Sequence, residues 1–460
     1  MTGVGGFLTI VGSMDVEAVF KAYDIRGRAD TGEVDVELFR RIGAAFVTLT
    51  GAPTICVGRD CRNSSPALFQ GLVDGVTSAG ADVIDLGEVP TDLVYYYSGS
   101  NDLPGAMITA SHNPPEYNGL KLCRSGAMPV GADTGLDEIK ASVQSSPPEP
   151  ASRLGTVEQV AVVDSYVAHL LAQIDSSALA PLTVAADGGN GMAGVAIEMV
   201  FSKIVCTLDG IYLEPDGTFP NHPADPLQAE NLVDLIARVR SKGHDLGVAF
   251  DGDADRAFFI DDTGEPLSGS TVTALIARAL LASEPGATVV HNLITSQAVP
   301  EIVSEAGGIP VRTRVGHSYI KQIMAETDAV FGGEHSGHYY FRDNYRADSG
   351  MIAMLVLLEV LSRDGRRLSE LRADVERYAS SGEINFRVSD PAAAMERVAT
   401  RYADHDGDRL DGLTVRLGVS WFNLRPSNTE PLLRLNVEAS DSGEVEEIVA
   451  EVGEIVKGVS

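Results

Sequence analysis

The chain has 460 residues, more than one hydrophobic core usually fills, and a prior of roughly 150 residues per domain gives about three domains or four small ones. Its 35 lysines and arginines and 65 aspartates and glutamates give a net charge of −30, which argues against nucleic acid or an anionic membrane face as a partner. The cysteines form no CxxC pair and no Cys/His cluster, so we expect a reduced, cytoplasmic protein without a disulfide framework or a zinc site. They are Cys56, Cys61, Cys123 and Cys206.

The first predicted domain covers residues 1–150. Residues 1–13 have no basic start and no long apolar core, so we predict neither a signal peptide nor a membrane span there, only an extension of the ordered chain. Pro147, Pro148 and Pro150 mark a linker at residues 145–152. The elements expected before it are a helix at 36–50, a strand at 54–58, a helix at 66–80 and a strand at 82–86.

Two further α/β domains are predicted at residues 156–262 and 263–378, and a small α+β domain at 382–460. Strands that alternate with helices indicate a layered α/β architecture. The expected helices are at 159–174, 270–282, 297–306, 349–362 and 393–403, and the one at 349–362 is apolar enough to be buried. The expected strands are at 182–186, 247–250, 257–260, 288–292, 311–315, 383–388, 413–417 and 432–438.

The stretch Thr109 to Pro114 (TASHNP) carries a candidate nucleophile. Asn113 and Pro114 favour a tight turn, which would expose Ser111 for chemistry. Taken alone, the same residues fit a polar turn or a helix cap equally well. The rest of the chain decides between these interpretations.

The stretch Asp251 to Arg256 (DGDADR) predicts a site for a hard cation. Its three carboxylates alternate with small residues between two strand-like segments, so several oxygens can face one Mg²⁺ or Ca²⁺ ion. An EF-hand is excluded because Arg256 stands where the sixth position needs glycine, and because the flanks are not helical. A solvated acidic turn is the remaining alternative, and magnesium with positions open to phosphate oxygens is the better interpretation.

Two loops carry candidate ligand-binding groups. In Gly332 to His338 (GGEHSGH), Glu334 and Ser336 can hydrogen-bond sugar hydroxyls, and the glycines allow close approach to the backbone. His335 and His338 lack a third nearby ligand for zinc. The loop from Arg425 to Pro431 (RPSNTEP) holds several hydrogen-bond donors close together, as binding of a dianionic phosphate requires. Further candidate donors are Arg26, Lys121, Arg312, Arg314 and Arg346.

The four stretches fall one in each predicted domain, so they imply a cleft at the domain junction that can close over a ligand. A serine nucleophile, a divalent metal, a sugar-binding loop and a phosphate clamp together indicate phosphoryl transfer on a sugar phosphate. A magnesium-dependent sugar phosphatase uses similar groups, and a silent sugar-phosphate binder is the non-enzymatic alternative. The intact serine, aspartates and Lys121 speak against the silent binder.

The combination of TASHNP, NGLK (Asn118 to Lys121), DGDADR, GEHSGH and RPSNTEP resembles the α-D-phosphohexomutase superfamily, in particular bacterial phosphomannomutase/phosphoglucomutase. The resemblance covers nearly the whole chain and keeps the order of the motifs. It implies three similar mixed α/β domains and a C-terminal domain like the TATA-binding protein, arranged around a central cleft. It also implies conversion of hexose 1-phosphate and hexose 6-phosphate, of mannose or glucose, through a hexose 1,6-bisphosphate.

The resemblance implies roles for single residues. Ser111 would be the phosphoserine, and its oxygens would complete the shell of one Mg²⁺ held by Asp251, Asp253 and Asp255. Arg256 would lie beside the transferring group, with Lys121 and His112 in proton transfer or charge stabilisation. Tyr23, Arg26, Arg346, His317 and His338 would line the cleft, Glu334 and Ser336 would hold the sugar's 3- and 4-hydroxyls, and Arg425, Ser427, Asn428 and Thr429 would clamp the unreactive phosphate.

Two residues depart from the pattern of relatives. Leu293 stands where some of them carry a basic residue, so Arg312 or Arg314, with His317, is the expected substitute. His335 stands where phosphoglucosamine mutases usually carry glutamine, which weakens that alternative without excluding it. We expect a monomer or dimer whose partners are small sugar phosphates. Mannose and glucose differ only at position 2, and a site that holds the 3- and 4-hydroxyls does not distinguish them, so we expect the protein to use both.

Overall fold

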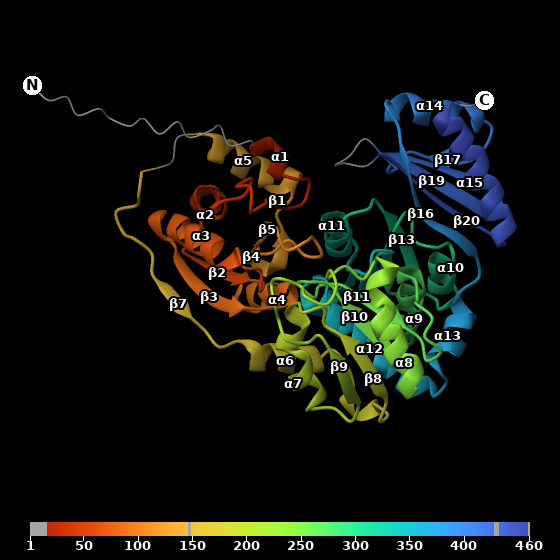
Figure 1. Ribbon diagram of the computed structural model, residues 1–460, viewed down its shortest axis with the longest axis horizontal. Coiled ribbons are helices and arrows are strands. Elements are labelled where there is room, and N and C mark those ends of the chain that lie inside the picture. Colours follow the sequence, from red (N-terminus) through yellow and green to blue (C-terminus); the bar gives the residue numbers. More distant parts are fainter. Residues whose placement is uncertain (1–15, 146–148, 427–431, 459–460) are drawn as a thin grey trace, which may run out of the picture.

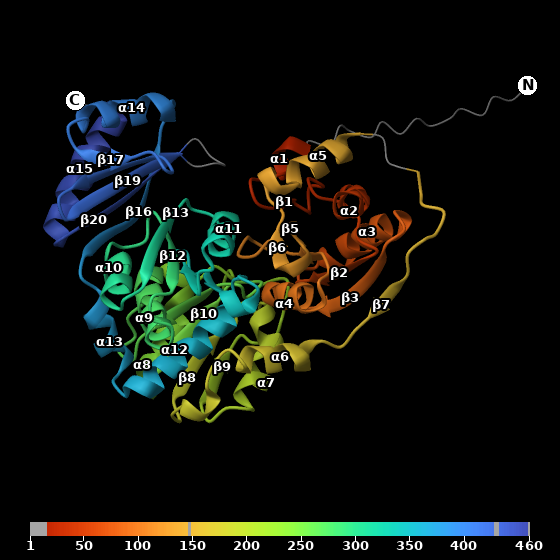
Figure 2. The same cartoon turned by 180° about the vertical axis from the view of Figure 1, so that it is seen from behind.

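The structure, a computed structural model, describes residues 16–145, 149–426 and 432–458. The expected N-terminal extension, the prolines Pro147 and Pro148, and the loop residues Ser427, Asn428 and Thr429 lie outside the described residues. Four domains follow one another along the chain. Figures 1 and 2 show domain 1 in red and orange and domain 4 in blue at the two ends of an arc, with domains 2 and 3 joining them.

The first three domains repeat one sheet. Each sheet has a core of four strands, which we count in chain order. The first strand lies between the second and the third and is parallel to both, and the fourth pairs antiparallel with the third. The four-strand cores are β3-β2-β4-β5, β9-β8-β10-β11 and β13-β12-β14-β15. This repetition confirms the prediction of three similar mixed α/β domains.

Domain 1 adds further strands to both edges of this core. Its elements are α1 (Val16–Val19), β1 (Ile25–Arg28), α2 (Val36–Thr50), β2 (Thr54–Arg59), α3 (Ser65–Ser78), β3 (Asp82–Glu88), α4 (Thr91–Asn101), β4 (Gly105–Ile108), β5 (Tyr117–Arg124), β6 (Met128–Pro129), α5 (Leu136–Gln144) and β7 (Val157–Gln159).

Domains 2 and 3 contain the repeated core with helices packed on it. Domain 2 comprises α6 (Val163–Leu171), β8 (Thr183–Asp187), α7 (Ile197–Phe201), β9 (Thr207–Ile211), α8 (Val233–Lys242), β10 (Leu246–Phe250) and β11 (Ala257–Ile260). Domain 3 comprises α9 (Gly269–Ser283), β12 (Thr288–Asn292), α10 (Ala298–Glu305), β13 (Ile309–Thr313), α11 (His317–Thr327), β14 (Phe331–Gly333), β15 (Tyr339–Phe341), α12 (Gly350–Asp364) and α13 (Leu368–Val375).

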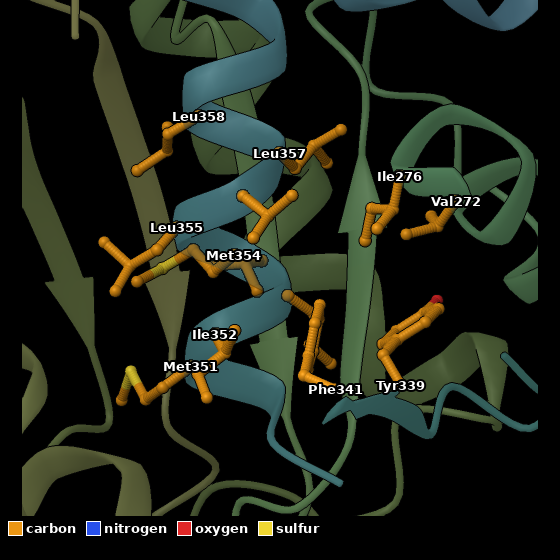
Figure 3. Close-up of a cluster of buried hydrophobic side chains, with 14 of the residues drawn as sticks. Val272, Ile276, Tyr339, Phe341, Met351, Ile352, Met354, Leu355, Leu357 and Leu358 are labelled. Atoms are coloured by element: carbon orange, nitrogen blue, oxygen red, sulfur yellow. The ribbon is translucent and has the colours of Figure 1, made fainter. Parts of the chain in front are cut away.

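Helix α12 lies in the main hydrophobic core. Ser349 caps it by accepting the Ile352 N–H, and Gly365 ends it in the left-handed conformation. Figure 3 shows its side chains pointing to opposite sides, with Leu357 on the side where Ile276, Tyr339 and Phe341 of the same domain lie and Leu355 and Leu358 on the other. The buried cluster around it includes Leu93 of domain 1 and Val248 of domain 2 as well as the residues of domain 3. One face of the domain 1 sheet therefore shares a core with domains 2 and 3, and its other face has a core of domain 1 residues alone.

Domain 4 is a five-stranded antiparallel sheet, β16-β20-β19-β18-β17, with two helices packed together, and it matches the α+β unit expected from the sequence. Its core contains only its own residues. Within the part of the chain that is described, no helix is long and apolar enough to cross a membrane. The elements of domain 4 are β16 (Ala379–Arg387), α14 (Pro391–Arg401), β17 (Asp406–Asp408), β18 (Leu413–Leu417), β19 (Ser420–Pro426), β20 (Leu432–Ala439) and α15 (Ser442–Lys457).

Candidate active site

The three motifs of domains 1 to 3 occupy the same turn, between the third and fourth strands of each sheet. Each turn follows the carboxyl end of a parallel strand, where ligands bind in open α/β sheets. Each also contains a left-handed residue, namely Ser111 (φ 50°), Ala254 (φ 62°) and Gly337 (φ 83°). The motifs are thus equivalent parts of three similar domains.

The three turns pack against one another. Ala257 donates its N–H to the carbonyl of Gly337 at 3.2 Å, and Arg256 and His338 form a β-bridge. Gly252 lies so close to the Ser111 carbonyl that a Cβ atom there would stand 2.4 Å from that oxygen. Glycine is therefore required where the metal loop meets the serine turn.

Ser111 is held between a carboxylate and a guanidinium. Its Oγ donates to Asp251 Oδ2 at 2.7 Å and accepts from Arg256 Nη2 at 2.8 Å, and the residue is only 3% exposed. Arg256 Nη2 also contacts His112 Nδ1, and its Nε donates to Asp251 Oδ2. Burial, followed by the charge of Arg256, lowers the pKa of His112 well below its usual value. His112 is consequently neutral at pH 7.

The three aspartates converge as a cation site requires. One oxygen from each of Asp251, Asp253 and Asp255 lies within 4.8 Å of the others. Lys121 pairs with Asp253 Oδ2 at 2.7 Å and also with Asp255. Thr91 donates its hydroxyl to Asp253 Oδ2 at 2.5 Å. Among the described residues, Asp253 Oδ1 and Asp255 Oδ1 are buried without a hydrogen-bond partner, so they are available to a divalent ion, and the residues fit Mg²⁺.

The charges of this cluster are strongly coupled. Burial raises the pKa of Asp251 and, together with the neighbouring Asp253 carboxylate, that of Asp255. Burial also acts on Asp253, but the Lys121 ammonium outweighs it and lowers that pKa. Three buried carboxylates face the cations of Lys121 and Arg256, which leaves an excess of negative charge for a bound metal to neutralise.

The sugar-loop candidates lie beside this cluster. Glu334 is buried and accepts from Asn292 Nδ2 at 3.1 Å and from the Tyr340 hydroxyl at 2.7 Å. Ser336 Oγ lies 3.0 Å from His338 Nδ1. His338 Nε2 lies 3.9 Å from Asp255 Oδ1, which connects the sugar loop to the metal loop. Burial and the charge of Arg256 lower the pKa of His338 well below its usual value.

Two residues of domain 1 reach toward the other motifs. The ring of Tyr23 packs edge-on against His317 at 5.4 Å between ring centroids, and its hydroxyl donates to the Val315 carbonyl at 3.2 Å. Arg26 Nη1 donates to Asn113 Oδ1 at 2.7 Å in the serine turn. Tyr23 thus contacts the start of α11 and Arg26 contacts the serine turn, and their predicted place in the substrate cleft stays a prediction.

The described part of the phosphate clamp borders a large cavity. Arg425 Nη2 pairs with Glu383 Oε2 at 3.0 Å, and Arg434, directly opposite on β20, lies 3.6 Å from the same carboxylate. Burial lowers the pKa of Arg425. Both arginines line a cavity of about 910 Å³ together with His335 and Ser336. The sugar loop and the clamp thus face one space.

Three arginines are placed away from this group. Arg346 lies 3.6 Å from Asp328, the residue that follows the C-terminal end of α11. His317 lies at the other end of this helix, against the ring of Tyr23. Arg312 binds Asp408 of domain 4 at 2.7 Å, and Arg314 lies over the ring of Tyr319. The predicted roles of these three arginines in binding substrate stay predictions.

Several residues of the site carry no sequence signal of their own. Lys321 pairs with Asp348 at 2.7 Å in a buried ion pair, and Asp348 Oδ2 lies 4.0 Å from His338 Nε2. Arg62 contacts the serine turn through backbone carbonyls. These partners are far apart in the chain, so the sequence gives no sign that they meet. Arg434 is different, because it stands four residues after Glu430 of the RPSNTEP loop and could have been predicted as a further phosphate-binding residue from that position.

A buried serine between a carboxylate and an arginine, a three-carboxylate cation site and a separate arginine-lined cavity define a phosphoryl-transfer enzyme site. Family models for phosphoglucomutase/phosphomannomutase match all four domains: α/β/α domain I at residues 17–149, domain II at 164–264, domain III at 268–378 and the C-terminal domain at 383–455. The chain belongs to the phosphoglucomutase/phosphomannomutase family, and its reaction class is that of the phosphohexose mutases.

Individual relatives agree. The chain is 41% identical over 444 residues to phosphohexose mutases of Xanthomonas campestris, covering 95% of this chain and 99% of the relative. It is 40% identical to a phosphomannomutase of Salmonella montevideo, covering 91% and 94%. A crystal structure of a phosphoglucomutase/phosphomannomutase family protein from Burkholderia thailandensis superposes with a TM-score of 0.87 at 31% identity, covering 96% and 98%. The family resemblance and the expected fold are confirmed.

Proposed function

We propose that the protein interconverts hexose 1-phosphate and hexose 6-phosphate of mannose, glucose or both, through a phosphoserine at Ser111 and a hexose 1,6-bisphosphate. The observation that carries this proposal is the Ser111 hydroxyl, held at 2.7 Å from Asp251 and 2.8 Å from Arg256 beside the three-carboxylate cluster. A phosphoryl group on this oxygen would lie among cationic donors and metal ligands, as phosphoryl transfer needs.

The reaction has two transfers. A sugar hydroxyl attacks the phosphorus of phosphoserine 111, the P–O bond to the serine breaks, and the hydroxyl proton passes to a protein base. The bisphosphate then turns around, and Ser111 takes the other phosphoryl group. Arg256 stabilises charge on the transferring oxygens, and Lys121 with His112 or His338 holds or moves the proton. Mg²⁺, held by Ser111 and the three aspartates, would neutralise charge during transfer.

The sugar is held by a different set of groups. Glu334 and Ser336 bind the 3- and 4-hydroxyls, with Tyr23 and His317 at the rim of the site. Arg425, Ser427, Asn428 and Thr429 clamp the phosphate that does not react. The shared cavity of about 910 Å³ supports this division, because it joins the sugar loop to Arg425. We further propose that the enzyme acts in the cytoplasm as a monomer or dimer.

Phosphorus NMR tests this function directly. The protein is incubated with Mg²⁺, a trace of hexose 1,6-bisphosphate and, in separate tubes, the 1-phosphates of mannose, glucose and glucosamine. Growth of a 6-phosphate signal with mannose or glucose is the expected result. Turnover of glucosamine 1-phosphate alone indicates a phosphoglucosamine mutase, release of inorganic phosphate alone a sugar phosphatase, and no change a binder without activity.

Replacing the nucleophile gives the first mutational prediction. Ser111→Ala should remove nearly all turnover, a loss of at least about 10⁴-fold as for other essential nucleophiles, because no other oxygen occupies its position. Ser100→Ala, at an exposed hydroxyl in α4, serves as the control and should retain wild-type activity. Near-wild-type activity of Ser111→Ala, measured in the same NMR assay, would overturn the role of Ser111.

A further inference from the structure

Arg62, in the loop after β2, has every donor of its guanidinium engaged. Its side chain is fully buried. Nη2 donates to the carbonyls of Ser111 at 2.8 Å and Asn113 at 2.6 Å, and Nη1 donates to those of Pro114 at 2.6 Å and Tyr117 at 3.1 Å. Nε donates to Asp60 Oδ2 at 3.0 Å. Four of the five acceptors are backbone oxygens of the turn that carries the serine.

Only arginine supplies this pattern. Four carbonyl oxygens converge on one buried side chain, and the turn would lose four hydrogen bonds at once if this donor were removed. Lysine offers three N–H groups on one nitrogen, whereas the planar guanidinium offers five in a fixed fork. The backbone of Ser111 is itself in the left-handed region (φ 50°), which a non-glycine residue adopts only when its surroundings impose it.

The arrangement recurs in the other two domains. In each, a residue at the end of the first strand of the core or just after it binds the functional turn that follows the third strand. In domain 2, Met192 donates its N–H to the Gly252 carbonyl at 2.9 Å. In domain 3, Asn292 donates to Glu334 at 3.1 Å. Arg62 is the domain 1 member of this series, and it makes the largest number of bonds to its turn.

Domain 2 covers Arg62 on the other side. The ring of Phe219 lies 5.1 Å from the guanidinium carbon, and a Cβ atom on Gly217 would stand 2.6 Å from Arg62 Cα. The Ser111 carbonyl that accepts from Arg62 also abuts Gly252 of the metal loop. A shift of this carbonyl would therefore move the serine relative to the carboxylates.

We propose that Arg62 is a positioning residue for phosphoryl transfer. It fixes the backbone from Ser111 to Tyr117 so that the serine Oγ points between Asp251 and Arg256. It touches neither the substrate nor the transferring group. The consequence for catalysis rests on the mutase function proposed above, whereas the fixing of the turn does not.

The test uses the full-length variants Arg62→Lys and Arg62→Met, with Asp60→Asn as a milder change that keeps the arginine. Hydrogen exchange of peptides spanning residues 105–124 measures the turn, and peptides from domains 3 and 4 provide the internal reference. Mutase assays give kcat and KM. We expect faster exchange in the turn only, a fall in kcat of about a hundredfold for Arg62→Met and less for Arg62→Lys, and KM values within threefold of wild type.

A matched control separates positioning from loss of stability. Leu72→Ala removes a fully buried side chain from α3 in the same domain. It should lower the melting temperature while kcat per folded molecule stays near wild type. Guanidinium at a non-denaturing concentration should partly restore kcat in Arg62→Ala, because the ion can re-enter the site that lost it.

Each outcome is decisive. Unchanged exchange in the turn of Arg62→Lys or Arg62→Met overturns the proposal, whatever the activity of the enzyme. Altered exchange with unchanged kcat shows that the turn is fixed for stability alone and also overturns it. A wild-type protein that converts none of the sugar phosphates removes the proposed function, and in that case the exchange data still decide whether Arg62 holds the turn.

Discussion

The histidines of the site act as neutral groups at physiological pH. Burial, with the charge of Lys121 and Lys321 nearby, lowers the pKa of His317 to about 4. Burial and the charge of Arg425 lower that of His335 to about 3. Positive charge for binding phosphate therefore comes from arginine and lysine, and a histidine in this site serves first as a hydrogen-bond donor or acceptor.

A histidine outside the site gives a testable pH dependence. His291 is buried at the end of β12, donates to the Asn292 carbonyl at 3.1 Å, and has its pKa lowered by burial from 6.5 to about 4. The unfolded chain takes up this proton first as the pH falls, so the stability due to neutral His291 is present above pH 6.5 and is lost between pH 6.5 and 4. The loss corresponds to about 3 kcal/mol.

His291→Gln should flatten this part of the pH profile. Urea unfolding at pH 7.5 and pH 4.5 measures the free energy of unfolding of both proteins, and the difference between the two pH values should be smaller for the variant. Other titrating groups contribute equally to both proteins and cancel. An equal loss of stability in wild type and variant would show that His291 is protonated in the folded protein.

Residues that form local motifs could be predicted from the sequence, and residues that act over long sequence distances could not. Ser111 and the three aspartates stand in short polar stretches with a chemical meaning of their own. Arg62 and Asp348 meet their partners only after folding brings separate loops together. Arg346 lies 3.6 Å from Asp328, a partner that its sequence neighbourhood did not indicate, and its predicted role in binding substrate stays a prediction.

At the scale of elements, a helix was predicted accurately where capping residues mark both of its ends in the sequence. Helix α2 has the predicted bounds because Asp35 accepts the Leu38 N–H at its start and Gly51 ends it in the left-handed conformation. The helix predicted at 159–174 begins later, as α6 at Val163, and Gln159 is the last residue of β7 instead. This strand exists through its pairing with β3, and its three residues are exposed, so no burial pattern marks it in the sequence.

Helix α4 provides a prediction on metal binding. Its first residue, Thr91, donates its hydroxyl to Asp253 Oδ2 at 2.5 Å and its N–H to the Asp253 carbonyl at 3.0 Å. These bonds orient the carboxylate so that Oδ1 remains open. Thr91→Val should weaken Mg²⁺ binding by about 10- to 100-fold, as loss of an outer-sphere partner commonly does.

Calorimetric titration of the unphosphorylated protein with Mg²⁺ measures this effect without any substrate. Thr91→Ser keeps the hydroxyl and should bind as wild type does. Thr48→Val makes the same change at an exposed threonine of α2 whose hydroxyl bonds to Ala44 of its own helix, and it serves as the control. Equal Mg²⁺ affinity of Thr91→Val and wild type would show that Asp253 needs no partner from domain 1.

At the scale of the whole molecule, we infer that the chain unfolds as two units rather than four. Domains 2 and 3 share the core around α12 with one face of the domain 1 sheet, whose other face has a cluster of domain 1 residues alone. The core of domain 4 contains residues of that domain alone. Domain 4 is joined to domain 3 by polar contacts such as Arg312 to Asp408 at 2.7 Å and the Gln297 N–H to Glu438 at 2.8 Å. The sequence indicated four units but not that three of them contribute to one core, because shared burial is a property of their assembly.

Calorimetric unfolding should therefore show two transitions. Leu355→Ala in α12 and Leu435→Ala in β20 each remove a fully buried leucine, at a cost of about 2–5 kcal/mol. Leu355→Ala should shift only the transition of domains 1 to 3, and Leu435→Ala only that of domain 4, because neither cluster contains the other's residues. A single transition that both variants shift equally would mean that the contacts through Arg312 and Glu438 couple domain 4 to the rest as strongly as a shared core does.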